Sequence, residues 1–280
     1  MIKEKAYAKI NLFLNVLSKR LDGYHEMEMV MTPLRLHDVL KFEKLNEDKI
    51  EIVSNIEITK KSKDNLIYKV ASFIKSEFEI DSGIRIHIEK NIPIAGGLAG
   101  GSADAAATIR GMNRLFKLDM DLKKMADLGV GFGADVPFCI YNKLAVVRGI
   151  GEKIQLLNTK LRTSILLVNP RVPVLTKTVF DNLNSEEFGQ KNYSDLIEGL
   201  KDRDISRVIN NLYNFMESTT FKLEPKVKEL KDEIQEMGIK GVLMSGSGST
   251  VFVMSRNKKL LSEAVSQLNE DYFTTITKTL

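Results

Sequence analysis

Alternating apolar and polar residues predict a strand near the start of the chain. From residue 6 to residue 16 the even positions are apolar, whereas the odd positions read Tyr, Lys, Asn, Phe and Asn. Because successive side chains of a strand point to opposite faces, one face is expected to be apolar and the other mostly polar, with Lys9 and Asn11 side by side on the polar one. Residues 83–89 alternate in the same way and predict a second strand, whose His87 faces solvent.

Helical spacing of apolar residues predicts three helices in the rest of the first half. They cover residues 65–78, 102–116 and 121–128. Asp64 is the expected N-cap of the first helix, since a short polar side chain there accepts a hydrogen bond from an otherwise unpaired N–H. Residues 20–25 (R-L-D-G-Y-H) predict a turn after the first strand.

The second half has the pattern of a strand, several helices, a hairpin, a helix and a closing strand. In order, these elements cover residues 164–168, 176–183, 193–200, 205–215, 225–237, 241–254, 258–268 and 273–279. This order is that of the split βαβ unit in ferredoxin-like domains. We therefore expect two domains, 1–157 and 158–280, with the boundary between Leu156 and Thr163.

A glycine-rich segment is the strongest candidate for a binding site. Residues 93–107 read P-I-A-G-G-L-A-G-G-S-A-D-A-A-A, so two glycine pairs directly precede a run of helix formers. Glycine lets a backbone take positive φ and approach a ligand closely, and Ser102 is expected to cap the helix. A helix N-terminus offers unpaired N–H groups and partial positive charge, so the segment predicts a site for an anion such as phosphate.

Two common glycine-rich motifs do not fit this segment. A Walker A loop requires a lysine after its last glycine, but Ser102 follows Gly101. A dinucleotide-binding fingerprint requires an acidic residue at the end of a second strand, but no strand precedes Asp119 or Asp121. A ligand-free linker is the weaker alternative, because a linker seldom runs straight into an alanine-rich helix.

Charge and cysteine content bound the class of protein. The net charge is +4, and the basic residues are scattered among acids, so nucleic acid is not an expected partner. The single cysteine, Cys139, lies in an apolar segment and is expected to be buried; it cannot form an intrachain disulfide, which suits a reducing compartment. Polar residues interrupt the first strand, so neither a signal peptide nor a membrane span is expected there. We expect a cytoplasmic protein with no membrane association and no obligate protein partner.

Two polar residues could perform chemistry next to a bound phosphate. Asp135, in G-A-D-V-P-F, could handle an acceptor hydroxyl, but it could equally be the cap of a short helix with Pro137 in its first turn. Lys9 could supply a cation, although local sequence favours an ordinary exposed strand lysine. The residues alone leave both alternatives open.

Three separated motifs resemble the GHMP superfamily of small-molecule kinases. They are A-K-I-N-L-F-L from residue 8, the glycine-rich segment from residue 93, and L-M-S-G-S-G-S-T-V-F from residue 243. The resemblance implies an α+β fold of two domains, an N-terminal ribosomal-protein-S5-like αβ domain and a C-terminal ferredoxin-like domain. It also implies a kinase that uses ATP and Mg²⁺ with a small-molecule acceptor.

Further motifs narrow the resemblance to members that act on cytidine-diphosphate-linked methylerythritol in non-mevalonate isoprenoid synthesis. These are R-L-D-G-Y-H-E from residue 20, D-N-L-I from residue 64 and G-A-D-V-P-F from residue 133. The six motifs span essentially the whole chain in order. Two alternatives remain. Tyr24, His25 and Phe180, as the clamp of a nucleobase, argue against a kinase with another acceptor (homoserine, mevalonate or a sugar). The presence of both Lys9 and Asp135 argues against a catalytically silent binding or regulatory protein on the same fold.

The resemblance also implies roles for individual residues. The catalytic lysine and aspartate of the family fall on Lys9 and Asp135. Cofactor binding is implied for Asn65, Pro93, Ala95, Gly96, Gly97, Leu98, Ala99, Gly100, Gly101, Ser102 and Ala103. Substrate binding is implied for Asn11, Tyr24, His25, Thr176 and Phe180. Gly246 and Gly248 would close around the active site, and the metal ligands are unknown. The departures from the family pattern are Tyr7, Ala99 and Ser249, and none removes a group that the chemistry needs.

Overall fold

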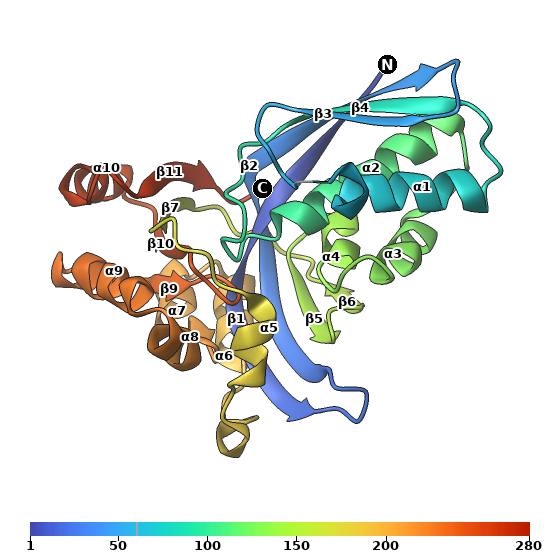
Figure 1. Ribbon diagram of the computed structural model, residues 1–280. Coiled ribbons are helices and arrows are strands. Elements are labelled where there is room, and N and C mark those ends of the chain that lie inside the picture. The colour runs from blue at the N-terminus through green and yellow to red at the C-terminus, as the bar shows by residue number, and fades with distance from the viewer. Residues whose placement is uncertain (60) are drawn as a thin grey trace. The chain divides into compact units, whose positions relative to one another are not determined.

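The computed structural model describes residues 1–59 and 61–280 (Figure 1). The chain forms two compact units that are not continuous in sequence. The first unit comprises Met1–Ala8, Leu36–Ile94 and Ala99–Asn142, and the second comprises Lys9–Arg35, Ala95–Leu98 and Lys143–Leu280. Strands β1 (Ile2–Lys19) and β2 (His25–Leu45) each contribute residues to both units.

The first unit is a sheet covered by helices. In it β4 (Gly83–Glu89) lies between β3 (Ile50–Ser54), to which it is parallel, and the second half of β2, to which it is antiparallel. The helices are η1 (Ser62–Asp64), α1 (Leu66–Glu77), α2 (Gly100–Phe116), α3 (Leu122–Val130) and α4 (Val136–Tyr141). Helices α1 and α2 run side by side (Figure 1).

Helix α2 packs closely on the sheet because it has a glycine at the contact. A β-carbon on Gly111 would lie 2.4 Å from Cε2 of Phe42, which is fully buried in β2. No side chain fits at that distance, so Gly111 lets the phenyl ring lie against the helix backbone. This contact fixes the height of α2 above the sheet.

The second unit contains the rest of the long strands and a separate four-stranded sheet. The first half of β2 pairs with β5 (Ala145–Gly149), β5 pairs with β6 (Lys153–Leu156), and β1 pairs with β8 (Tyr213–Asn214). The turn predicted between β1 and β2 is present, with Gly23 at a φ of 86° and the Arg20 N–H donating to the Tyr24 carbonyl at 2.8 Å.

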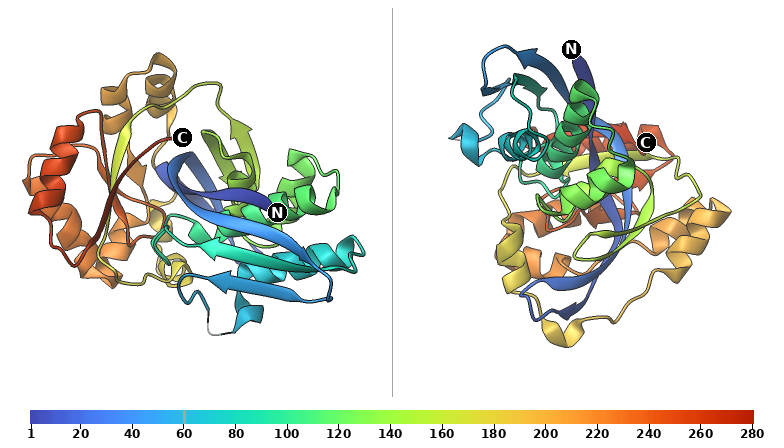
Figure 2. Two further views of the ribbon diagram at one scale, coloured as in Figure 1. Left: turned by 90° about the horizontal axis from the view of Figure 1, so that it is seen from above. Right: turned by 90° about the vertical axis from the view of Figure 1, so that its right-hand side faces the viewer.

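The ferredoxin-like order predicted for the second half is confirmed. The four strands β7 (Ser164–Asn169), β9 (Val242–Met244), β10 (Val251–Ser255) and β11 (Phe273–Lys278) lie in the order β11-β7-β10-β9. Helices α9 (Pro225–Glu236) and α10 (Lys258–Gln267) pack against this sheet (Figure 2). The remaining helices are α5 (Thr176–Asp181), η2 (Ser185–Glu187), α6 (Ser194–Asp202), α7 (Ile205–Asn210) and α8 (Glu217–Leu223).

Some local predictions were wrong. Asn65, not Asp64, caps α1: its Oδ1 accepts from the Ile67 N–H at 2.9 Å, while Asp64 belongs to the preceding 3₁₀ turn. The helix expected over residues 205–215 ends at Asn210, because the chain then joins β1 as the short strand β8. Strands β2, β3, β5 and β6 and helix α8 were not predicted.

Candidate active site

Lys9 is a buried cation beside the glycine-rich segment. Lys9 lies in the part of β1 that belongs to the second unit, and it is only 4% exposed. The backbone N–H donates to the Leu98 carbonyl at 3.1 Å, and Nζ donates to Oδ1 of Asn11 at 2.8 Å. Nζ also lies 3.5 Å from where a β-carbon on Gly246 would be. The interpretation of Lys9 as an ordinary exposed lysine is therefore wrong, since burying an ammonium group carries a cost that a surface lysine avoids.

The tip of the glycine-rich segment packs against the motif that follows β9. Ser245 Oγ donates to the Gly97 carbonyl at 3.0 Å, and the Thr250 N–H donates to the Gly96 carbonyl at 3.3 Å. Gly97 has a φ of 72°, and a β-carbon there would lie 2.1 Å from the Ser245 carbonyl oxygen. Both the backbone angle and the close approach require glycine at this position.

The second part of the segment forms the N-terminus of α2 in the first unit. Ala99 caps the helix with its backbone in the left-handed region (φ 56°, ψ 31°), a conformation that the more usual glycine would adopt without strain. Helix α2 begins at Gly100, so Ser102 lies in its first turn and not at the cap as predicted. Ser102 Oγ is 3.6 Å from the position of a β-carbon on Gly133. The first N–H groups of α2 have no intrahelical acceptors, which suits a phosphate.

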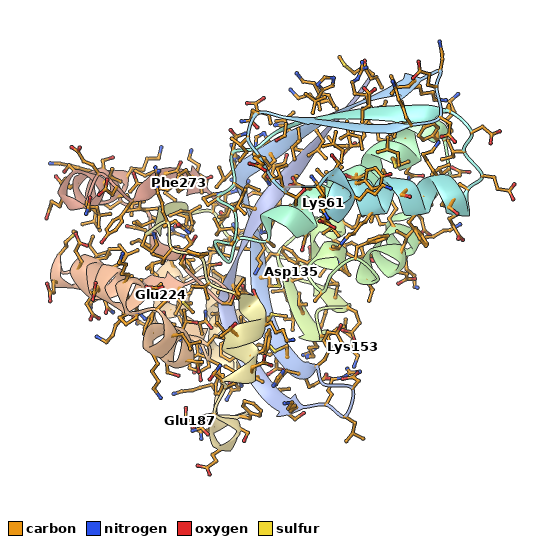
Figure 3. All side chains as sticks on the ribbon, viewed as in Figure 1. Lys61, Asp135, Lys153, Glu187, Glu224 and Phe273 are labelled. Carbon is orange, nitrogen blue, oxygen red and sulfur yellow. The ribbon has the colours of Figure 1, made fainter. Side chains whose placement is uncertain are left out.

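Asp135, labelled in Figure 3, occupies the N-cap position of α4, but its side chain does not cap the helix. Its backbone is right-handed helical (φ −85°, ψ −11°), and within the described part of the chain its carboxylate makes no capping hydrogen bond. Pro137, in the first turn, lacks an N–H and so needs no capping partner there. The position is that of a cap, as one interpretation of the sequence had it, but the half-buried carboxylate does not cap the helix.

An aromatic cluster surrounds His25 at the start of β2 in the second unit. The rings of His25 and Phe180 stack with centroids 5.0 Å apart and planes at 25°, and the ring of Phe188 meets His25 edge-on at 5.9 Å. Burial, with a smaller contribution from the charge of Lys19, lowers the pKa of His25. The imidazole is therefore neutral at neutral pH and offers one donor and one acceptor.

The other predicted site residues are placed as follows. Tyr24, next to His25, is 58% exposed. The Thr176 hydroxyl shares a hydrogen bond with the Ser247 hydroxyl at 2.9 Å. Asn11 is fully buried and its amide contacts Met29 Sδ at 3.3 Å. Sequence reasoning missed Phe188 and Ser247 as neighbours of site residues. Ser247 lies within the motif that begins at residue 243, whereas no local pattern marks Phe188.

The described residues contain neither a cluster suited to a metal ion nor a helix suited to a membrane. Across residues 1–59 and 61–280, no group of three or more His, Cys, Asp or Glu residues is arranged to hold a metal ion. Among the helices that the structure describes, none is long and apolar enough to cross a membrane.

The fold and these motifs define a class of enzyme. The family model described as GHMP kinases N terminal domain matches residues 65–143, and the one described as GHMP kinases C terminal matches residues 196–274. The chain belongs to the GHMP kinase family and is a small-molecule kinase, for which the family implies ATP as the phosphoryl donor.

The similar proteins include one kind of kinase repeatedly. The 4-diphosphocytidyl-2-C-methyl-D-erythritol kinase of Bacillus cereus (strain B4264) is 42% identical over 248 residues, which cover 89% of this chain and 86% of the relative. A crystal structure of 4-(cytidine 5'-diphospho)-2C-methyl-D-erythritol kinase has a TM-score of 0.84 at 29% identity and covers 99% of both chains. The L. major mevalonate kinase, with a TM-score of 0.79 at 14% identity over 100% of this chain and 96% of that one, shares the fold.

Proposed function

We propose that this chain transfers the γ-phosphoryl group of ATP to the 2-hydroxyl of 4-diphosphocytidyl-2-C-methyl-D-erythritol, in the non-mevalonate route to isoprenoid precursors. The observation that carries the choice of acceptor is the 42% identity, over 89% of the chain, to a kinase named for that compound. The single cysteine suits a reducing compartment, and we place the reaction in the cytoplasm.

The glycine-rich segment is the proposed phosphate cradle. Its backbone N–H groups at the start of α2 would hold the phosphates, and the nucleotide would bring Mg²⁺ as part of the Mg²⁺–ATP substrate. Magnesium in such sites keeps several waters and takes one or two protein oxygens besides the phosphates. Ser102 and Asp135 offer oxygen donors of this kind in the first unit, which fits a metal that arrives with the nucleotide.

Asp135 and Lys9 are the proposed catalytic pair. Asp135 would accept a hydrogen bond from the acceptor hydroxyl and take its proton as the new O–P bond forms and the bond from the γ-phosphorus to the ADP oxygen breaks. A carboxylate is a weak base, so we expect proton transfer late in the reaction, with alignment of the hydroxyl as its larger contribution. The buried ammonium of Lys9 would offset the negative charge that develops on the transferred group.

The aromatic cluster is the proposed cytidine pocket. Neutral His25 can hydrogen-bond the edge of a cytosine with both a donor and an acceptor, which a protonated imidazole could not do. Tyr24 and Phe180 would stack on the base, with Asn11 and Thr176 toward the rest of the acceptor. A nucleobase needs such a clamp, whereas homoserine or mevalonate does not.

A coupled assay of ADP release tests the acceptor. The panel contains the cytidine-diphosphate-linked methylerythritol, homoserine, mevalonate and a hexose. We expect turnover with the first compound alone. Turnover with one of the others would assign another member of the family, and no turnover with any would favour a catalytically silent protein.

The same assay tests the catalytic pair. In Asp135→Asn we expect kcat to fall by about 10²–10⁴-fold, because the amide can neither accept the proton nor orient the hydroxyl in the same way. Asp127→Asn is the matched control, since Asp127 pairs only with Lys123 on an exposed helix face among the described residues. Near-native kcat in Asp135→Asn would remove Asp135 from the mechanism.

A further inference from the structure

Three charged side chains, none of them part of the proposed catalytic pair, meet in the interior of the first unit. Lys90, at the end of β4, forms ion pairs with Asp38 of β2 and, at 2.7 Å, with Asp104 of α2. All three side chains are at most 4% exposed. The proposed reaction uses none of them, so the cluster calls for another explanation.

The cluster joins the two stems of the glycine-rich segment. On the entering side, Oδ1 of Asp38 accepts the backbone N–H groups of Asn91 and Ile92, at 2.5 Å and 2.8 Å. On the leaving side, Asp104 holds the second turn of α2 to Lys90. Lys90 thus connects the chain that enters the segment to the helix that follows it.

Lys90 also lies directly beneath the start of α2. Its Nζ is 3.5 Å from the position of a β-carbon on Gly100, and Cγ2 of Ile92 is 3.1 Å from the same point. The first residue of the helix therefore rests on the cluster and on the entering stem. A shift of Lys90 would move the N–H groups that are proposed to face the phosphates.

The cluster has one carboxyl group more than a simple ion pair needs. Two carboxyl groups face one ammonium, and Oδ1 of Asp104 has no hydrogen-bond partner among the residues that the structure describes. Burial raises the pKa of Asp104 to about 8, against the lowering effect of Lys90 and with a further increase from Asp38. A buried ion pair contributes little net stability compared with apolar residues of similar size, so its value can lie in fixing geometry.

We propose that Lys90, Asp38 and Asp104 are positioning residues that set the spacing of the two loop stems and thereby the affinity for the nucleotide phosphates. This inference rests on the proposed role of the glycine-rich segment as the phosphate cradle. The three side chains act through the backbone of residues 91–92 and 100–102 and do not touch the nucleotide.

The test compares variants that break or keep the link between Lys90 and α2. Asp104→Leu removes the acceptor and keeps a side chain that branches at Cγ, whereas Asp104→Asn keeps an oxygen that can accept from Lys90. The control is Glu4→Leu, which removes ion pairs of Glu4 with Arg110 and Arg114, near the other end of the same helix. Asp38→Asn is a second variant: its Oδ1 still accepts the Asn91 and Ile92 N–H groups, but its amide cannot accept from Lys90.

Two readouts separate positioning from stability: the KM for ATP and for the acceptor, and the Kd for ADP and for adenosine by titration calorimetry. In Asp104→Leu and Asp38→Asn we expect the KM for ATP and the Kd for ADP to rise about tenfold, because small misplacements of binding groups are costly. The acceptor KM and the adenosine Kd should stay unchanged, since neither ligand's recognition uses the α2 N–H groups. Asp104→Asn should keep most of the ADP affinity of the unmodified protein. Glu4→Leu should lower the melting temperature without changing the ADP affinity.

One pattern of results would overturn the proposal. If Asp104→Leu and Asp38→Asn lose thermal stability as Glu4→Leu does but bind ADP within twofold of the parent, the cluster is only structural. Failure of the proposed function looks different, because the unmodified protein would then show no ADP release with the cytidine-linked acceptor.

Discussion

Asp104 shows how one buried carboxyl group makes the stability of the fold depend on pH. Burial among Lys90 and Asp38 raises its pKa to about 8, so the folded protein holds a proton there that the unfolded chain releases near its ordinary value of about 4. Where the folded state binds the extra proton, stability falls as the pH rises. The contribution is therefore fully present below about pH 4 and is lost by about pH 8.

Asp104→Asn removes this titration while keeping the shape of the side chain. We expect the free energy of unfolding of the unmodified protein, minus that of Asp104→Asn, to decrease between pH 5 and pH 8 and to level off above. Urea denaturation of both proteins at about four pH values in this range measures the difference. A difference that is constant, or that grows with pH, would show that Asp104 is ionised throughout.

At the scale of the element, the glycine-rich segment contains glycines of two kinds. Gly97 has positive φ and lies against the Ser245 carbonyl, where a β-carbon would be 2.1 Å away. Gly101 lies in the first turn of α2, and no described atom comes within 4 Å of where its β-carbon would be. The backbone geometry therefore requires glycine at position 97, whereas position 101 requires glycine only if a ligand approaches it.

This contrast gives a matched pair of variants, each tested by its melting temperature. Gly97→Ala should lower the free energy of unfolding by at least about 1–2 kcal/mol, from the left-handed backbone alone, and further because the β-carbon must displace the Ser245 backbone. Gly101→Ala should be neutral or stabilising by up to about 1 kcal/mol, since alanine is the better helix former. Equal melting temperatures for the two variants would mean that the tip of the segment rearranges freely.

How far the elements were predictable depends on whether one face of each is polar. Strand β4 alternates and was predicted with its exact bounds, including an exposed His87 that faces Glu43. Strand β2 was missed because residues 29–34 in its middle are all buried, which erases the alternation that Glu26, Met27, Glu28 and Met29 show at its start. The predicted N-caps of α1 and α2, Asp64 and Ser102, were off by one and three residues. Asp64 and Asn65 are both good caps, and only the fold selects one of them.

The candidate site was predictable where a motif is local and not where it depends on contacts across the chain. The glycine-rich segment and the turn before His25 follow from short-range rules. The burial of Lys9 does not follow from short-range rules. Alternation places Lys9 on a polar face, which is expected to be exposed, whereas in the structure Lys9 contacts Asn11 and Leu98. The stacking of His25 on Phe180 joins positions far apart in sequence, so only the resemblance to a family could suggest it.

At the scale of the whole molecule, the family places two domains along the sequence, while the contacts define units that exchange segments. The family models match residues 65–143 and 196–274, which is compatible with a boundary near residue 157, although that boundary stays a prediction. The compact units instead change over inside continuous strands, between Ala8 and Lys9 in β1 and between Arg35 and Leu36 in β2. The glycine-rich segment likewise contributes Ala95–Leu98 to the second unit and Ala99 onward to the first.

Because the units share two strands, we expect them to unfold together. Strands β1 and β2 run on without a break from one unit into the other, so melting either unit would cut their ladder in mid-strand and expose the backbone groups next to the cut. Differential scanning calorimetry should show one transition whose calorimetric and van't Hoff enthalpies agree, unlike the separate transitions common in proteins with independent domains. Two resolved transitions, or a van't Hoff enthalpy well below the calorimetric one, would mean that each unit is stable without the other's half of the shared strands.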